Sequence, residues 1–333
     1  MKQIAIIGAG SWGTALAVVA ARAGHSVRLW SRSAAVINSI NDQRVNSRYL
    51  SSTSIPDGVT ATAEIDDALR EASMVLLAVP SHAARETLTA MSAHLTENAI
   101  LVNVAKGIEI ESGKRISEIA KEVVDASHPF VALSGPSFAK EVVAGHPTAI
   151  VAASKDIAAA RTVQNDLSFE NLRIYTNVDV VGTELGGAVK NVMAIAAGMT
   201  AGLGFGANSV AALITRGLAE ITRLARREGA QMETLMGLAG LGDLVLTCTG
   251  SLSRNRFVGE ELGKGRTLEE ITAQLSEVAE GINTARAVKN LADRAGLEMP
   301  ITNEVNAVLY DGKPVRDAVS ELMSRPLREE NPR

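Results

Sequence analysis

A glycine-rich loop near the start of the chain is the feature that most restricts its fold. Gly8, Gly10 and Gly13 follow a short apolar run and precede a helix-like run, Thr14 to Ala21. Between a strand and a helix, a G-x-G-x-x-G pattern is typical of a dinucleotide-binding βαβ unit. Its glycines let backbone N–H groups approach a pyrophosphate, and the helix N-terminus adds positive dipole. They also interrupt the uncharged stretch after Lys2, so we predict neither a signal peptide nor a membrane helix.

Strand signals occupy only the first part of the chain. Up to about Tyr175, short apolar runs rich in β-branched residues alternate with helical patterns, which predicts βαβ units. Beyond about Val178 the pattern is helical. We therefore expect an α/β Rossmann-type doubly wound parallel sheet as a dinucleotide-binding domain (1–178), an all-α substrate domain (179–327) and a polar, disordered tail (328–333). The expected strands are 4–7, 27–30, 74–79, 100–104, 130–133 and 149–152.

Length and composition favour two domains in a reducing compartment. The 333 residues, 46% of them hydrophobic, exceed the length of about 250–300 residues at which single cores stop growing. A net charge of −4 without a long Lys/Arg run makes nucleic acid a poor candidate partner. The single cysteine, Cys248, cannot form an intrachain disulfide, which favours the cytoplasm, and we interpret it as a buried apolar thiol.

The carboxyl ends of the expected strands mark the ligand crevice of an open α/β sheet. They carry the Gly8 loop, Pro80, Lys106 and residues 135–137. After the second strand, where an NAD-specific site usually offers an acidic side chain to the ribose, this chain has Ser31 and Arg32. A hydroxyl and a cation suit a 2′-phosphate, so we predict that NADPH is preferred or at least accepted. The alternative is that Arg32 is a solvated surface cation.

Elimination leaves lysine as the acid–base group. Reduction of a carbonyl by hydride requires a proton donor, commonly a histidine, a tyrosine assisted by lysine, or a lysine. All five histidines precede the helical part, which excludes a histidine base in the substrate domain. Their spacing also suggests no metal site. Tyr49, Tyr175 and Tyr310 have no lysine four positions on, which removes the usual Tyr-Lys pair.

The helix expected over 179–201 carries Lys190 on an unusual face. The residues around Lys190 on the helical wheel are small and uncharged, although a glycine costs roughly 1 kcal/mol against alanine in a helix interior. They are Thr183, Gly186, Gly187, Ala194, Ala197 and Ala201. We interpret this face as a place where backbone, cofactor or substrate approaches closely, rather than as a solvated outer face. There Lys190 would be partly desolvated, with its pKa lowered toward neutrality, as a proton donor near pH 7 requires.

A second helix start carries an unexpected positive charge. Ser253 is a natural N-cap, which places Arg254 and Asn255 in the first helical turn. A basic residue there opposes the helix dipole unless an anion lies beside it, so we predict an anion site; an exposed basic turn is the alternative. Upstream, Asp243 lies in an apolar segment, and we expect a lysine partner because an unpaired buried charge is costly.

Six segments closely resemble the bacterial-type NAD(P)-dependent glycerol-3-phosphate dehydrogenase family over essentially the whole chain. They are GAGSWGTALA (8–17), NVAKGIE (103–109), LSGPSFAKEV (133–142), GGAVKNVMAIAAG (186–198), GDLVLTCTGSLSRN (242–255) and VAEGINTA (278–285). The resemblance implies a C-terminal domain like that of 6-phosphogluconate dehydrogenase, which also mediates dimerisation. It further implies NAD(P)H-dependent reduction of dihydroxyacetone phosphate to sn-glycerol 3-phosphate for glycerophospholipid synthesis, by a cytoplasmic homodimer.

The resemblance also implies roles for individual residues. Lys190 would be the acid–base residue, Lys106 would polarise or position the substrate, and Asp243 would orient the lysine and contact the substrate. The other substrate contacts would be Gly135, Ser137 and, at the phosphate, Ser253, Arg254 and Asn255. The cofactor contacts would be Gly8, Gly10, Ser11, Trp12, Gly13, Arg32, Lys106, Ala139, Arg254, Val278 and Glu280.

Two other functions fit part of this pattern. A β-hydroxyacid dehydrogenase shares the layout and a Gly-x-x-x-Lys helix such as Gly186 to Lys190, but it would bind a carboxylate, for which the turn 253–255 is not needed. A catalytically silent NAD(P)-binding redox sensor would have no need of Lys106, Lys190 and Asp243.

Overall fold

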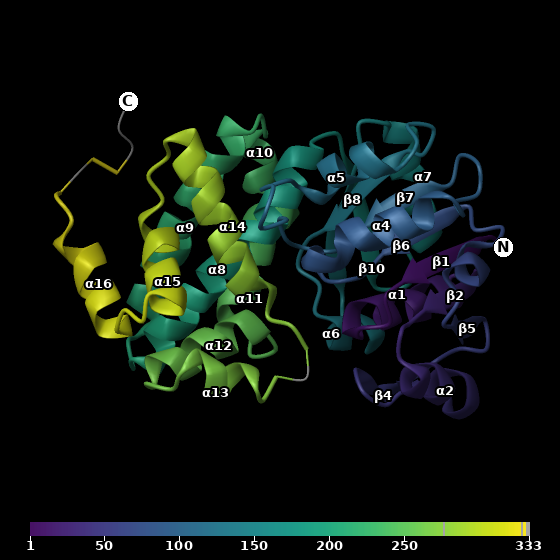
Figure 1. The fold of residues 1–333 in the computed structure, drawn as a ribbon, viewed down its shortest axis with the longest axis horizontal. Coiled ribbons are helices and arrows are strands. Elements are labelled where there is room, and N and C mark those ends of the chain that lie inside the picture. The colour runs from purple at the N-terminus through teal and green to yellow at the C-terminus, as the bar shows by residue number, and fades with distance from the viewer. Residues whose placement is uncertain (276, 328, 331–333) are drawn as a thin grey trace.

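The computed structural model describes residues 1–275, 277–327 and 329–330, which form a sheet half and a helical half lying side by side (Figure 1). The sheet half contains an eight-stranded sheet in the order β10-β9-β8-β7-β6-β1-β2-β5 and a separate ribbon of β3 and β4. The strands are β1 (Gln3–Ile7), β2 (Ser26–Trp30), β3 (Val45–Asn46), β4 (Leu50–Ser54), β5 (Val59–Thr62), β6 (Met74–Leu77), β7 (Ile100–Asn103), β8 (Phe130–Ser134), β9 (Thr148–Ala153) and β10 (Leu172–Asn177).

Helices cover both faces of the large sheet because its central strands are apolar on both faces. In β1, Ile4 and Ile6 belong to one buried cluster, whereas Ala5 and Ile7 belong to another. This confirms the predicted doubly wound architecture. The helices of this half are α1 (Ser11–Arg22), α2 (Ala34–Gln43), α3 (Ile65–Leu69), η1 (Ser81–Ala83), α4 (Ala84–Ser92), α5 (Ile116–Val123), α6 (Ala139–Val143) and α7 (Ile157–Leu167).

The sheet differs from the prediction at its margins. Every predicted strand is present, but β9 runs antiparallel to β8, so the sheet is not wholly parallel. The edge strands β5 and β10 were not predicted, nor were β3 and β4. The two edge strands were not predicted because they carry polar residues. β10 alternates buried and exposed positions at its start, and β5 contains two threonines. An edge strand needs only one apolar face, so a search for continuous apolar runs misses it.

The helical half is built around α8 (Val180–Gly202), which corresponds to the helix expected over 179–201. The side chain of Asp179 caps it by accepting a hydrogen bond from Gly182 N at 2.8 Å. Residues 182–200 are all buried, so α8 is enclosed on every side. The other helices are α9 (Ala207–Arg227), α10 (Met232–Leu235), η2 (Leu238–Gly242), α11 (Asp243–Thr249), α12 (Arg254–Gly263), α13 (Leu268–Thr272), α14 (Glu280–Ala295), α15 (Pro300–Tyr310) and α16 (Val315–Ser324).

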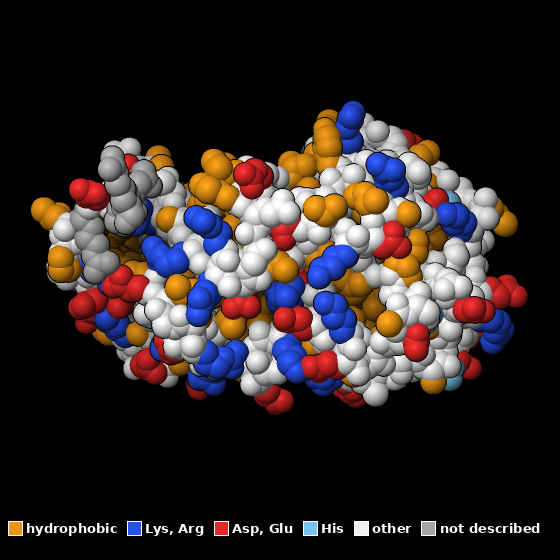
Figure 2. Space-filling model, turned by 90° about the horizontal axis from the view of Figure 1, so that it is seen from above, with side chains coloured by type: hydrophobic (Ala, Val, Ile, Leu, Met, Phe, Trp, Pro, Cys, Tyr) orange, Lys and Arg blue, Asp and Glu red, His pale blue; other side chains and the backbone are white. Residues whose placement is uncertain are grey.

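The change from strands to helices falls between Asn177 and Val180. The division into domains at residue 178 stays a prediction, and the tail predicted over 328–333 lies mostly outside the described residues. Among the described residues no single helix is long and apolar enough to cross a membrane. One bent pair of helical segments, 232–249 with 254–263, has a sufficient length and apolar content when the two are taken together. On the face in Figure 2, basic and acidic side chains are interspersed over both halves.

Glycines let α8 and α12 pack backbone against backbone. A Cβ on Gly198 of α8 would lie 2.0 Å from Arg256 O, and one on Gly202 would lie 2.2 Å from Glu260 O. In return, a Cβ on Gly259 of α12 would lie 1.9 Å from Ile195 O. No side chain fits at these positions, so the relative position of the two helices is set by main-chain atoms.

We expect Gly259→Ala to lower the free energy of unfolding by about 1–3 kcal/mol, although alanine is the better helix former, because the added methyl group must push the helices apart. Urea unfolding measures this. Gly242→Ala is the matched control, since its Cβ would meet its nearest atom at an ordinary 3.6 Å. Equal stability of the two variants would contradict the packing argument.

Candidate active site

The glycine loop has the geometry of a phosphate cradle. Gly8 has φ +121°, and a Cβ there would lie 2.5 Å from Ala78 O; a Cβ on Gly13 would lie 1.9 Å from Gly8 O. A Cβ on Gly10 would instead meet nothing within 4 Å, so the space beside this residue is open. Gly10 is also the N-cap of α1 and provides no side-chain cap. The first N–H groups of α1 therefore face a place that can hold an anion.

The ribbon of β3 and β4 supports the glycine loop through hydrogen bonds from Asn46. Asn46 is fully buried, and its amide donates hydrogen bonds to Ala9 O at 2.9 Å and Thr14 Oγ1 at 2.8 Å. Ser11 Oγ lies 2.9 Å from Tyr49 O. Trp12 Nε1 is buried without a hydrogen-bond partner among the described residues. Asn46 could not be identified from the sequence, because nothing local distinguishes it from the asparagines of an ordinary turn.

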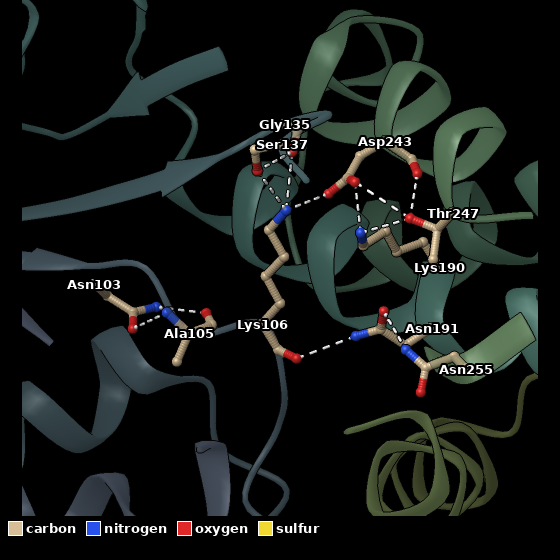
Figure 3. A network of polar contacts seen from close by, with 10 residues as sticks. All are labelled: Asn103, Ala105, Lys106, Gly135, Ser137, Lys190, Asn191, Asp243, Thr247 and Asn255. Atoms are coloured by element: carbon tan, nitrogen blue, oxygen red, sulfur yellow. Dashed lines mark hydrogen bonds and ion pairs between the residues drawn. The ribbon is translucent and has the colours of Figure 1, made fainter. Parts of the chain in front are cut away.

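Asp243 lies between two lysines that come from opposite halves of the molecule (Figure 3). Its Oδ1 accepts from Lys190 Nζ on α8 at 2.5 Å, and its Oδ2 accepts from Lys106 Nζ, beyond the end of β7, at 2.7 Å. The carboxylate is fully buried. The predicted lysine partner of Asp243 is therefore confirmed, and there are two of them.

Lys190 is held in a dry, polar environment. The residue is 6% exposed, and Nζ also donates to Thr247 Oγ1 at 2.7 Å. Burial is the largest influence on its pKa and lowers it to about 8, because lost hydration and the nearby Lys106 charge outweigh the attraction of Asp243. The lowered pKa predicted for this lysine is thus confirmed. Cys248 lies nearby, and burial raises its pKa to about 12, so its thiol carries no charge.

The glycines around Lys190 admit other chain segments, as their cost in a helix suggested. A Cβ on Gly186 would lie 2.6 Å from Ala239 O, and one on Gly187 would lie 2.5 Å from Ser134 Oγ. The second contact brings α8 against the end of β8, where the substrate-binding turn was predicted. The predicted close approach to these glycines is therefore found. The contact between Gly187 and Ser134 also holds Lys190 near the carboxyl end of β8.

Lys106 is fixed at both ends. Its Nζ donates to Gly135 O at 2.9 Å and to Ser137 Oγ at 3.4 Å, in addition to Asp243. Its carbonyl accepts from the side chain of Asn191 at 3.2 Å. Sequence reasoning missed Asn191 and Thr247, although each lies within one helical turn of a residue that it did identify. Asn191 directly follows Lys190, and Thr247 lies one helical turn after Asp243, so both could have been proposed as site residues from their spacing.

The predicted anion clamp begins α12. Ser253 is its N-cap and accepts from Arg256 N at 3.2 Å, as predicted. Asn255 is buried: it donates to Asn191 Oδ1 at 3.0 Å and accepts from Gly281 N at 2.9 Å. Arg254 forms an ion pair with Glu277, a residue that the sequence did not single out. All three clamp residues are therefore already bonded within the protein.

Three serine–glutamate pairs join the two halves. Ser81 Oγ donates to Glu280 at 2.5 Å, and Ser117 Oγ donates to Glu184 on α8, also at 2.5 Å. Ser11 Oγ donates to Glu277. Glu280 was predicted as a cofactor contact, and its hydrogen bond to Ser81 joins the start of α14 to η1, which follows β6.

The structure brings together only part of the predicted site. Lys106, Gly135, Ser137, Lys190 and Asp243 form one hydrogen-bonded cluster, while Arg254 and Ser11 meet through Glu277. The remaining predicted cofactor contacts take no part in these hydrogen bonds: Arg32 and Val278 are exposed and Ala139 is the first residue of α6. Their roles stay predictions.

Comparison with known proteins gives matches along nearly the whole chain. Residues 3–160 match the family model for the NAD-dependent glycerol-3-phosphate dehydrogenase N-terminus, and residues 179–320 match that for its C-terminus. Glycerol-3-phosphate dehydrogenase [NAD(P)+] of Koribacter versatilis is 55% identical over 98% of both chains, and that of a Geobacter species is 49% identical over 99% of both. The crystal structure of glycerol-3-phosphate dehydrogenase from Coxiella burnetii is similar with a TM-score of 0.94 and 40% identity, over 97% of this chain and 99% of that one.

We expect Asp243→Asn to destabilise the protein by about 3–5 kcal/mol, because it leaves the buried ammonium of Lys190 and the part-buried one of Lys106 without their shared counter-charge. Urea unfolding near pH 7 measures the loss. Asp42→Asn, an equivalent change at an exposed position of α2, should leave stability within about 0.5 kcal/mol. A small effect of Asp243→Asn would mean that at least one lysine is neutral in the free protein.

Proposed function

This chain belongs to the NAD-dependent glycerol-3-phosphate dehydrogenase family, and on that premise we propose how its residues carry out the reaction. The enzyme reduces dihydroxyacetone phosphate to sn-glycerol 3-phosphate with NAD(P)H. Family membership sets aside both a β-hydroxyacid dehydrogenase and a silent redox sensor. The observation on which our mechanism rests is the buried group of Lys190, Asp243 and Lys106.

Lys190 is the proton donor. The nicotinamide, when bound, supplies the hydride that converts the substrate carbonyl to an alkoxide. With a pKa of about 8, roughly nine in ten Lys190 amines carry a proton at pH 7, yet the proton is easier to give up than that of an ordinary lysine. In the oxidative direction the neutral amine takes a proton from the substrate hydroxyl.

Asp243 and Lys106 position the proton donor and the substrate. The carboxylate of Asp243 holds both amines, so the ammonium of Lys190 does not have to reorient during the reaction. Lys106 adds positive charge beside Gly135 and Ser137, where the alkoxide develops. Thr247 accepts one hydrogen of the Lys190 ammonium and thereby fixes the direction of the others.

The loop and the clamp bind the two phosphate-bearing ligands. The uncapped start of α1, with open space beside Gly10, fits the pyrophosphate of NAD(P)H. The start of α12, with Ser253, Arg254 and Asn255, fits the phosphate of the substrate. Each ligand phosphate thus meets a helix N-terminus, one in each half of the molecule.

We further propose a preference for NADPH, since Arg32 is an exposed cation at the end of β2 and no acidic side chain stands beside it in the sequence. A cytoplasmic location, a homodimer and a supply of glycerol 3-phosphate to phospholipid synthesis follow from the family resemblance.

Removal of the amine should abolish turnover and spare cofactor binding. We expect Lys190→Ala to lower the rate of NADPH oxidation with dihydroxyacetone phosphate at least about a hundredfold, as the loss of a general acid does. Lys289→Ala, on the surface of α14, serves as control. NADPH affinity, measured by fluorescence, should stay within about twofold of wild type. Retained turnover would exclude Lys190 as the proton donor.

The direction of the pH dependence follows from the lowered pKa of Lys190. Reduction requires the ammonium form, so kcat/KM should be level below about pH 7 and should fall about tenfold per pH unit well above pH 8. Oxidation of glycerol 3-phosphate should show the opposite trend and rise through pH 8. Initial rates in both directions across pH 6–10 test this, and parallel profiles would argue against a shared lysine.

A further inference from the structure

Glu277 joins the two helix starts that the ligand phosphates require. It accepts hydrogen bonds from Ser11 Oγ, at the first residue of α1, and from Arg254 Nη1, at the first residue of α12. Its side chain is only 18% exposed, whereas that of Arg254 is 48% exposed. In Figure 1 the chain between α13 and α14, which carries Glu277, runs beside the sheet half. One carboxylate therefore connects the glycine loop with the anion clamp.

Both helix starts offer Glu277 an environment made for an anion. Neither α1 nor α12 has an acidic residue in its first turn, and α1 has no side-chain cap. A negative charge is stabilised at such a helix start by the N–H groups and the helix dipole. Glu277 brings a negative charge to both helix starts from within the chain, through its contacts with Ser11 Oγ and Arg254 Nη1.

The charges of the crevice point the same way. Between the two helix starts, the cation of Arg254 is paired with the carboxylate of Glu277, so their charges cancel there. A crevice for a dinucleotide and a phosphate ester needs an excess of positive charge, and withdrawal of Glu277 from Arg254 would provide it.

We propose that Glu277 sets the affinity of the cofactor site by standing in for a phosphate: in the ligand-free protein it occupies Ser11 and Arg254, and the bound dinucleotide displaces it. This inference rests on the proposed function, which places the pyrophosphate at the start of α1. The free protein divides between a closed form, with Glu277 in place, and a form able to bind. The measured Kd is therefore the intrinsic Kd divided by the fraction of the second form.

Glu277→Gln keeps the shape of the side chain and removes its charge, so it should tighten binding. We expect the Kd for NADPH to fall about fivefold, a modest factor because Arg254 is half-exposed and water weakens its ion pair. Glu269→Gln, an exposed residue of α13, is the control with the same charge change and should leave Kd within about 1.5-fold. Titration of NADPH fluorescence measures all three proteins.

A gain in affinity separates this role from a structural one. If Glu277 only fastened the two halves, its removal would weaken binding or leave it unchanged, and either result overturns the proposal. A weaker Kd would instead identify Glu277 as a direct contact of the ligand. Glu277→Ala, which removes both acceptor oxygens, should tighten binding at least as much as Glu277→Gln, and thermal unfolding confirms that each variant is folded.

Binding of inorganic pyrophosphate provides a second test of the role of Glu277 that does not depend on the enzymatic reaction. Calorimetric titration with inorganic pyrophosphate should show the same gain for Glu277→Gln over wild type. If wild type binds pyrophosphate but not NADPH, the proposed function fails while the ratio of pyrophosphate affinities still decides the role of Glu277. If wild type binds neither, both proposals fall together.

Discussion

The sharing of Asp243 by two lysines is the interaction on which the rest of the site depends. Burial of a lone carboxylate is costly, and the buried ammonium of Lys190 could not lie so close to the part-buried one of Lys106 without a carboxylate between them. One lysine comes from the sheet edge and the other from the central helix. The site therefore exists only where the two halves meet, and the enclosure of α8 keeps them in register.

Contacts of two kinds secure this arrangement. Backbone packing between α8 and α12 fixes Lys190 relative to the start of α12, and the close approach of Gly187 to Ser134 fixes it relative to the sheet. Serine–glutamate pairs then link the halves at their margins. The Ser117–Glu184 pair is buried. The Ser11–Glu277 pair is only part-buried, and it is the pair that we propose a ligand replaces.

Features encoded in a few neighbouring residues could be predicted from the sequence. The glycine loop, the helix with Lys190 among small residues, and the N-cap Ser253 each have a local pattern with a physical reason. The lysine partner of Asp243 followed from the cost of burying a lone charge. Edge strand β10, the antiparallel course of β9, Asn46 and Glu277 could not be predicted in this way. Their roles come from contacts between distant segments, as in the 266 residues that separate Ser11 from Glu277.

The backbone packing of α8 on α12 has a consequence for which substrates this scaffold can accept. It sets a fixed distance between the ammonium of Lys190 and the start of α12, to which we assign the substrate phosphate. The protein would therefore select substrates by the length of the carbon skeleton between carbonyl and ester. Substitution of lining side chains could alter the width of that space but not its span.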